Sequence, residues 1–373
     1  MKKFPTLYMK NINDKIRIWN ITVYKDNNKC YIKKKYGFLN GKIVETEPYE
    51  ISHNGKISCY DKALTKANYE WVKKKKQGFQ ENISNIENNK LKNILPMLAY
   101  KLEDNYKKII YPACVQKKLD GFRCLSYYEN NELKIYSKGK NLFTTLDHIE
   151  NEIKLLLNYS KNYILDGELY INDLKLRKIS SILLKKKLTE DNKKSILKIS
   201  FNIFDLINKD DLNMDFKSRY NILKNLFLDK KFKYINLVNI YNVNSYIDIE
   251  VYLKQFLNMG YEGIVVRNYN GIYNFGKKSK DVLVSKQIKY DKFKIIGSKK
   301  GSGQYKDSVI WKLECKNNKE KSFWSTSMGT IKNREKLYQN RSKYINRYVK
   351  VKYFDIDSNG CVIRNPVVFL KNN

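Results

Sequence analysis

The pattern of hydrophobic and polar positions in the first eighty or so residues predicts a small sheet followed by one helix. Residues 16–24 and 31–38 are strand-like runs rich in isoleucine, tyrosine and valine, and Asn40-Gly41 between such runs is a turn signal. Residues 61–76 then place apolar side chains at helical spacing among lysines. We therefore expect a sheet-plus-helix unit over residues 1–85.

The rest of the chain divides into two parts with different patterns. Residues 81–92 are polar and rich in asparagine, which is typical of a linker. Over 91–291, short β-rich runs alternate with amphipathic helices, for example at 146–157 and 249–259, which predicts an α+β domain. Over 292–373, short strands predict a small β-barrel of the OB type; they are 293–296, 309–314, 348–354 and 362–370.

The charge of the chain indicates a polyanionic partner. Against 38 Asp and Glu there are 73 Lys and Arg, which gives a formal net charge of +35. A field of this strength favours nucleic acid as the partner. The excess is mostly lysine beside abundant Asn, Ile and Tyr, the mix expected from an A/T-rich coding sequence, so part of the charge could also be ordinary solvated surface.

The cysteines and histidines exclude several kinds of site. The two histidines, His53 and His148, are too few for a histidine-based triad or metal cage. The six cysteines form no CxxC pair, so we expect reduced thiols of an intracellular protein; they are Cys30, Cys59, Cys114, Cys124, Cys315 and Cys361. The chain has no signal-peptide run and no apolar stretch long enough to cross a membrane, which predicts a cytoplasmic or nuclear protein without a membrane partner.

Residues 118–123 carry the strongest chemical signal in the chain. Their sequence, KLDGFR, places a lysine amine beside an acid, a glycine and an arginine. Such an amine can attack the α-phosphate of a nucleoside triphosphate, while its neighbours supply orientation, close backbone approach and a contact to the nucleotide. A lysine with an ordinary pKa near ~10.4 is a poor nucleophile at neutral pH, so partial burial and neighbouring cations must lower it.

Further motifs follow this one in a fixed order along the chain. They are SKGK at 137–140, LDGEL at 165–169, FNIFDL at 201–206, EGIVVR at 262–267, KQIK at 286–289 and RNPVVF at 364–369. With these motifs, residues 96–369 resemble an ATP-dependent DNA ligase with an adenylyltransferase domain and an OB domain. The resemblance implies a nucleotidyltransferase fold with antiparallel sheets and helices, similar to ATP-grasp.

The resemblance also implies the roles of individual residues. Lys118 is the nucleophile that carries AMP, and Lys286 and Lys289 neutralise the α-phosphate. Arg123 and Glu168 hold the ribose, Phe204 stacks on adenine, and Glu262, with Glu168, holds Mg²⁺ or Mn²⁺. The full set expected to bind the nucleotide is Gln116, Arg123, Lys138, Glu168, Phe204, Glu262, Arg267, Lys286 and Lys289. ATP and nicked duplex DNA are the implied partners of what we expect to be a monomer.

Three positions depart from the family pattern. Lys138 stands where the second motif has an arginine, and it keeps the charge but loses the bidentate fork. The lysines of the fifth motif are separated by two residues rather than one, so the roles of Lys286, Lys289 and Lys292 stay open among the three. Gln116 stands where an acid often reads the adenine amino group, and its carbonyl can still accept that hydrogen bond.

Alternatives remain for the function and for the first unit. An RNA ligase or an mRNA guanylyltransferase of the same superfamily, or a non-catalytic DNA-binding scaffold, would share much of this pattern. Residues 1–85 resemble the WGR domain of DNA-damage proteins, with Tyr36-Gly37-Phe38 at the place of its Trp-Gly-Arg signature. This unit is thus expected to be either a DNA clamp or a small adaptor with a solvated basic face.

Overall fold

The computed structural model describes residues 1–10, 15–27, 29–51, 57–85, 94–171, 183, 189–301, 305 and 307–370. The chain divides into two compact units, Met1–Ser285 and Lys286–Asn373. The predicted linker at 81–92 falls largely outside the described residues. Among the described helices, none is long and apolar enough to cross a membrane.

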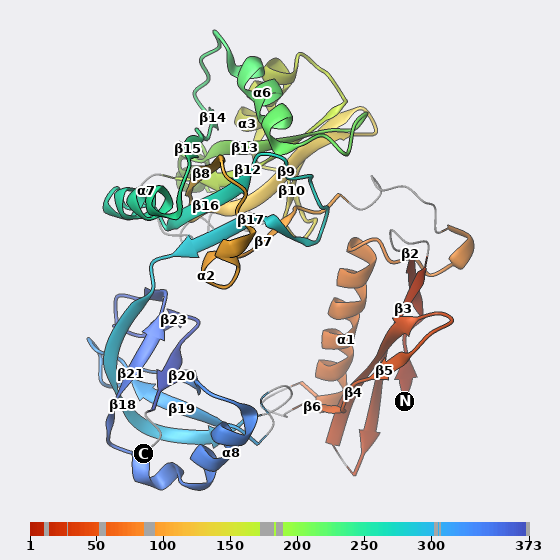
Figure 1. The fold of residues 1–373 in the computed structure, drawn as a ribbon. Helices are drawn as coiled ribbons and strands as arrows, with labels where there is room; N and C mark the ends of the chain where they lie inside the picture. The colour runs from red at the N-terminus through yellow and green to blue at the C-terminus, as the bar shows by residue number, and fades with distance from the viewer. Residues whose placement is uncertain are drawn as a thin grey trace. The chain divides into compact units, whose positions relative to one another are not determined.

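The first part of the chain is the predicted antiparallel sheet with one helix (Figure 1). Its strands follow the order β1-β3-β4-β5, with β2 beside β3 and β6 beside β4. Helix α1 (Cys59–Lys76) starts where the Ser58 hydroxyl accepts a hydrogen bond from the Asp61 amide, and it packs Ala63 and Ala67 on the sheet. The strands are β1 (Lys2–Lys3), β2 (Leu7–Lys10), β3 (Ile16–Asp26), β4 (Lys29–Phe38), β5 (Ile43–Glu45) and β6 (Tyr49–Ile51).

The middle of the chain, from about residue 94 to 285, contains two sheets (Figure 1). The six-stranded sheet has the order β11-β10-β9-β12-β13-β14, and the five-stranded sheet has the order β15-β8-β16-β17-β7. The strands are β7 (Leu98–Lys101), β8 (Ala113–Lys118), β9 (Phe122–Glu129), β10 (Glu132–Ser137), β11 (Leu142–Phe143), β12 (Tyr163–Tyr170), β13 (Ser200–Asn208), β14 (Ile235–Leu237), β15 (Tyr241–Val243), β16 (Gly263–Asn268) and β17 (Lys278–Lys286).

Helices cover the outer faces of these two sheets. Residues of α3 and α6 share one core with the odd-numbered residues of β12, whereas α7 packs on the five-stranded sheet. Between the sheets, residues of β9, β12, β13 and β17 form a separate core. The helices are α2 (Leu102–Asn105), α3 (Asp147–Leu157), α5 (Glu190–Ile196), α6 (Phe216–Phe227) and α7 (Tyr246–Asn258). Helix α7 begins three residues earlier than predicted because Ser245 and Asp248 form a capping box.

The second unit is a closed five-stranded barrel, which is consistent with the OB fold predicted for it. The order around the barrel is β18-β19-β20-β24-β21. The fully buried Trp311 lies in its core, and its indole N–H donates to the Ser327 hydroxyl at 2.6 Å. The elements are β18 (Lys289–Lys300), β19 (Val309–Glu314), β20 (Ser322–Ser327), α8 (Ile331–Gln339), β21 (Tyr348–Tyr353), β22 (Asp355–Ile356), β23 (Val362–Arg364) and β24 (Val367–Phe369).

Two expectations differ from the structure in this unit. The unit begins at Lys286 rather than at 292, because β18 starts at Lys289 and pairs with β21 from its first residue. The prediction that all cysteines are reduced thiols is wrong for Cys315 and Cys361, which form a disulfide. Backbone hydrogen bonds between 316–317 and 359–360 bring the two cysteines together, which their sequence separation of 46 residues had concealed.

Candidate nucleotidyl-transfer site

Lys118 is the last residue of β8 and lies beside the carboxylate of Glu262. The backbone sets this arrangement, because Lys118 pairs with Gly263 of β16 and the Glu262 amide donates to the Lys118 carbonyl at 3.0 Å. The Lys118 ammonium forms an ion pair with Glu262, and the two side chains are only 20% and 14% exposed. The candidate nucleophile is therefore held at the end of a strand by a largely buried partner.

Glu168, on β12, is the contribution of the six-stranded sheet to the surroundings of Lys118. In the register of β9 and β12 it stands opposite Arg123. Burial raises the pKa of Glu168 to about 7, with smaller opposing effects of Arg123 and Lys118, and the Asp166 and Glu262 charges raise it further. Because the charges of Lys118, Arg123 and Glu262 all influence the pKa of Glu168, the four side chains form one electrostatic cluster to which both sheets contribute.

Gly121 makes room for this cluster. A Cβ atom at Gly121 would lie 2.2 Å from the Leu169 carbonyl oxygen and 2.8 Å from the Cγ atom of Glu168. Any other residue would push β12 away from the loop that follows Lys118. The glycine of the KLDGFR motif is thus required by the close approach of two backbones.

Arg123, predicted to hold the ribose, is paired with Asp166. The guanidinium donates to both carboxylate oxygens of Asp166 at 2.6 Å and to the Met97 carbonyl at 3.3 Å. Burial disfavours the charge of Arg123, but the neighbouring Asp166 outweighs this and raises the pKa of Arg123. The Tyr273 hydroxyl also donates to Asp166 and accepts from the Met97 amide at 3.0 Å. Asp166 and Tyr273 were not predicted as site residues, although Asp166 stands inside the LDGEL motif.

Phe204, on β13, lies within cation–π distance of two guanidinium groups. The ring centroid is 4.7 Å from Arg123 and 5.5 Å from Arg267. The Phe204 carbonyl accepts from the amide nitrogen of Gln116 at 3.2 Å. This hydrogen bond connects the two sheets at the position predicted for the base.

Gln116 and Arg267 are buried rather than open to a ligand, at 1% and 3% exposure. The Gln116 amide nitrogen donates to the Phe204 and Val238 carbonyls, and its oxygen accepts from Nε of Arg267 at 2.8 Å. These hydrogen bonds fix the orientation of the Gln116 amide, because in the flipped orientation its oxygen would face the two carbonyl oxygens. Arg267 therefore contacts Gln116 and Phe204 from the buried side of the site and does not face a ligand.

Asp205 anchors this buried arrangement and was not predicted. Its carboxylate accepts from Arg267 at 2.9 Å and from Arg219 at 2.9 and 3.1 Å. Burial alone would raise the pKa of Asp205, but the two arginines outweigh it and lower that pKa. Arg219 also donates to the Met214 and Gly271 carbonyls. Asp205 follows Phe204 directly in the FNIFDL motif, whereas no motif marks Arg219.

The three remaining predicted lysines lie in different places. Lys138 is in the turn after β10, and its amide donates to the Arg123 carbonyl at 3.0 Å, so it borders the cluster. Lys286 ends β17 and Lys289 opens β18, and both belong to the barrel unit. The phosphate contacts expected of Lys138, Lys286 and Lys289 stay predictions.

The carboxylates of this cluster suit a hard divalent cation. Within the described residues no group of three or more His, Cys, Asp or Glu side chains is arranged to hold a metal ion. Glu262 and Glu168 offer two carboxylates at one place, and Mg²⁺ is typically held by one or two carboxylates completed by substrate phosphates and water. The donor set therefore fits a metal that arrives with a nucleoside triphosphate.

Sequence comparison assigns the same part of the chain to a protein family. The profile described as "ATP dependent DNA ligase domain" matches residues 96–286, about half of the chain. The DNA ligase of African swine fever virus (strain Badajoz 1971 Vero-adapted) is 28% identical over 235 residues, covering 61% of this chain and 52% of the viral protein. The DNA ligase of Methanococcus vannielii is 29% identical over 241 residues, covering 58% and 41%. The chain spans about half the length of the curated relatives it matches.

Two solved structures share the fold. Pmar-Lig_PreS3 has a TM-score of 0.65 at 20% identity, with 74% of this chain and 67% of that chain covered. A structure from a structure-function analysis of Lig E DNA ligases has a TM-score of 0.58 at 22% identity, with 74% and 98% covered. Identities this low describe the fold, and they agree with the sheets and barrel reported above.

The buried network predicts that Asp205→Asn is strongly destabilising. The substitution keeps the size of the side chain but leaves the buried Arg219 and Arg267 without a counter-charge, which costs about 3–5 kcal/mol of the free energy of unfolding. Urea unfolding of both proteins measures the loss. Asp210→Asn, at an exposed position, is the matched control and should stay within about 0.5 kcal/mol of the wild type. A loss below about 1 kcal/mol in Asp205→Asn would contradict the proposed importance of the network.

The raised pKa of Glu168 predicts a pH-dependent stability. Because the pKa is about 7 in the folded protein and near ~4.3 when unfolded, the folded state binds an extra proton between these values and loses stability as pH rises across that interval. The glutamine of Glu168→Gln cannot titrate. The difference in the free energy of unfolding, variant minus wild type, should therefore increase by up to about 1.4 kcal/mol per pH unit between pH ~5 and ~7. Urea unfolding at several pH values measures the gain.

Glu132→Gln provides the control for this pH series. Glu132 is exposed, and the hydrogen bond from Lys134 lowers its pKa, so it is ionised in both states above pH ~5. Its removal should leave the pH dependence parallel to that of the wild type. Parallel curves for Glu168→Gln and the wild type would refute the assignment of Glu168.

Proposed function

Because the chain belongs to the ATP dependent DNA ligase domain family, we propose that it seals 5′-phosphate, 3′-hydroxyl nicks in duplex DNA with ATP. The observation that carries the proposal is the position of Lys118, paired with Glu262 at the end of β8 and adjacent to Glu168. A lysine amine among carboxylates suits covalent nucleotidyl transfer, in which proton acceptors must stand next to the nucleophile.

The proposed reaction has three steps. The Lys118 amine, after giving up a proton, attacks the α-phosphorus of ATP, so that a P–N bond forms and pyrophosphate leaves. A 5′-phosphate oxygen of the DNA then attacks the AMP phosphorus and releases the lysine. Finally the 3′-hydroxyl attacks the activated 5′-phosphate, closes the phosphodiester bond and expels AMP. Glu262 pairs with the ammonium before the first step, and Glu168, whose pKa is about 7, can exchange a proton near neutral pH.

We assign the nucleotide contacts to the cluster and its surroundings. Arg123 and Glu168 are paired neighbours on β9 and β12, and we assign the contacts to the ribose to these two side chains. Phe204 offers a ring for the base, whereas Gln116 and Arg267 fix that ring and its backbone from the buried side. The proposed phosphate contacts come from Lys138, Lys286 and Lys289.

Magnesium is proposed as the cofactor. Glu262 and Glu168 would hold it, and when bound it supplies positive charge to the triphosphate oxygens. The supporting observations are that Glu262 pairs with the candidate nucleophile and that the charges of both Lys118 and Glu262 influence the pKa of Glu168.

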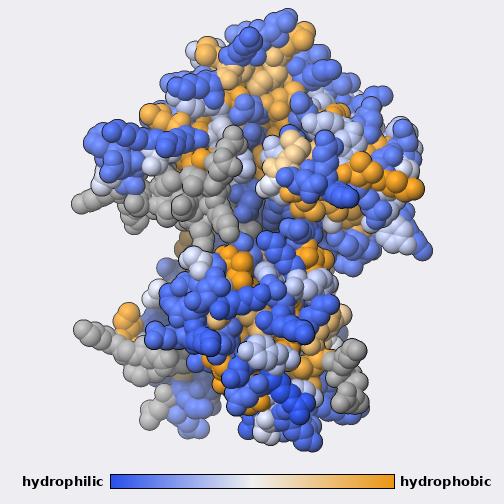
Figure 2. Space-filling model, turned by 90° about the vertical axis from the view of Figure 1, so that its left-hand side faces the viewer, coloured by the Kyte–Doolittle hydropathy of each residue, from blue (hydrophilic) through white to orange (hydrophobic). Residues whose placement is uncertain are grey.

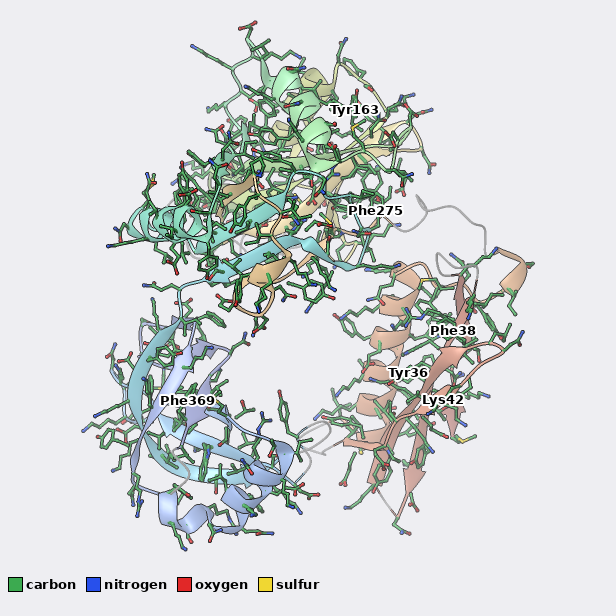
Figure 3. The ribbon with its side chains drawn as sticks, viewed as in Figure 1. Tyr36, Phe38, Lys42, Tyr163, Phe275 and Phe369 are labelled. Atoms are coloured by element: carbon green, nitrogen blue, oxygen red, sulfur yellow. A yellow bond between two sulfur atoms is a disulfide. The ribbon has the colours of Figure 1, made fainter. Side chains whose placement is uncertain are left out.

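We propose that residues 1–85 contribute to DNA binding, as their resemblance to WGR domains suggests. Lys74 is half-buried, and its Nζ atom lies 5.8 Å from the Trp19 ring. Its pKa is lowered by burial and by the nearby charges of Arg17, Lys34 and Lys73, which outweigh the opposing charge of Glu70, the ion-pair partner of Lys34. Crowded cations repel one another, and a phosphate group would relieve that repulsion. Figure 3 labels Tyr36, Phe38 and Lys42 in the region of β4 and β5 of the same unit.

Replacement of Lys118 tests the chemistry. Lys118→Ala should abolish the covalent adduct formed with α-phosphate-labelled ATP and magnesium, because no amine then reaches the phosphorus. Lys117→Ala is the matched control: it removes the neighbouring lysine, which hydrogen-bonds Tyr261, and should keep the adduct. Labelling of the Lys118→Ala protein, detected on a denaturing gel, would refute the assignment. Labelled GTP in a parallel reaction separates this function from that of a guanylyltransferase.

Removal of the N-terminal sheet and helix, residues 1–85, tests the DNA partner. A protein that starts near Leu91 should still form the adduct but seal a nicked duplex with a higher KM for DNA, since part of the phosphate contact is lost. The same reaction on nicked RNA distinguishes an RNA ligase. An adduct without any sealing of either nick, in the full chain, would favour a non-catalytic scaffold. Equal KM values for the full and shortened proteins would show that residues 1–85 bind something other than the nick.

A further inference from the structure

The outer surface of the barrel unit carries an ordered set of aromatic and basic side chains. Alternation along β18, β21 and β24 turns Phe293, Val351 and Val368 into the core and the intervening residues outward. We call these outward residues the tyrosine-lysine face. They are Tyr290, Lys292, Lys294, Tyr348, Lys350, Lys352, Val367 and Phe369.

The strand register places these residues side by side. Tyr290 pairs with Lys352, Lys292 with Lys350, and Lys294 with Tyr348 across β18 and β21. Lys350 also pairs with Phe369 of β24, which Figure 3 labels on the barrel. Tyr290 and Tyr348 stand four residues apart along the strands, a separation of about 14 Å.

The rings on this face are available for stacking. Tyr290 meets Phe369 edge to face, with centroids 5.9 Å apart, and Nζ of Lys350 lies 4.6 Å from the Tyr290 centroid. Tyr290 is nevertheless 46% exposed and Tyr348 is 68% exposed. A tyrosine ring that is this exposed suits a flat ligand with a π-face.

The charged residues of the tyrosine-lysine face are all basic. No acidic residue stands at the outward positions of these three described strands, and none of the four lysines forms an ion pair with a described carboxylate. Asp291, on the inward side of β18, is already engaged by Lys316 at 2.6 Å. Hydrophilic residues also predominate on the side of the barrel shown in the lower half of Figure 2.

We propose that the tyrosine-lysine face binds unpaired, single-stranded nucleic acid, with bases stacked on Tyr290 and Tyr348 and phosphates on the lysines. Every base has a π-face, so such binding tolerates any sequence, and the surrounding cations follow the backbone. Sealing of a nick between paired ends does not require this property. The face would hold a strand that is unpaired beside the site of action, such as a flap or an overhang.

The test measures binding by the full chain without any ligation. Fluorescence anisotropy compares a labelled oligothymidylate, an oligouridylate and an abasic deoxyribose-phosphate strand of equal length. Stacking predicts that the strands with bases bind more tightly than the abasic strand, although all carry the same charge. Tighter binding of the thymidylate or of the uridylate identifies DNA or RNA as the preferred source. Equal binding of all three would overturn the proposal.

Variants then locate the binding on this face. Tyr290→Ala and Tyr348→Ala should each weaken binding of the preferred strand about five- to a hundredfold and leave the abasic strand unchanged. Tyr348→Phe keeps the ring and should keep the affinity. Tyr106→Ala is the matched control, because Tyr106 is 47% exposed and also contacts a second aromatic ring, that of Tyr246.

Lysine variants separate the charge contribution. Lys292→Gln and Lys350→Gln should weaken the binding of all three strands, and each should reduce the slope of log affinity against log salt by about 0.7. Near-ultraviolet circular dichroism shows whether each variant is folded. Loss of affinity in Tyr106→Ala equal to that in Tyr348→Ala, or retention in both, would refute the assignment to this face.

Discussion

The buried carboxylate of Asp205 is the constraint on which the rest of the candidate site depends. Asp205 belongs to the six-stranded sheet, Arg267 and Gln116 to the five-stranded sheet, and hydrogen bonds run continuously from Asp205 through Arg267 to Gln116 and back to Phe204. An ion pair inside a protein is costly to desolvate and tolerates little displacement once formed. The pair therefore fixes the distance and the register of the two sheets, and each sheet brings half of the charged cluster. Lys118 ends β8 and Glu262 directly precedes β16, while β9 and β12 carry Arg123 and Glu168.

That fixed geometry gives the two glutamates of the cluster different properties. Glu262 forms an ion pair with Lys118, so the carboxylate of Glu262 has a charged partner in the protein. Glu168 forms no comparable ion pair with another described residue, and burial raises its pKa to about 7. One carboxylate thus pairs with the ammonium while the other can hold or release a proton near neutral pH, a separation of roles that follows from position rather than from residue type.

Much of this could be predicted from the sequence, because family motifs record residues and their order. The relation to ATP-dependent DNA ligases is confirmed, and the helices at 61–76 and 146–157 were close to their observed bounds. Arg219 could not be predicted, since its importance lies in a contact with Asp205 that forms only in the folded chain and no local pattern marks it. The disulfide was missed for a similar reason: backbone hydrogen bonds between the turns at 316–317 and 359–360, and not sequence spacing, bring Cys315 to Cys361. Helix α8 lies among strands, and its single buried residue, Leu337, gives little periodicity to detect.

The excess of lysine has a different meaning in each part of the chain. Around Lys118, cations are matched by Glu262, Glu168 and Asp166, so charge is balanced where the chemistry is proposed. On the barrel, the outward lysines of β18 and β21 have no carboxylate among them and share their face with aromatic rings. An A/T-rich coding sequence can account for many lysines and tyrosines, but it does not by itself confine them to one side of a strand. Alternation does that, because the inward positions mostly hold apolar residues that fill the core, while the outward positions are free to meet a ligand.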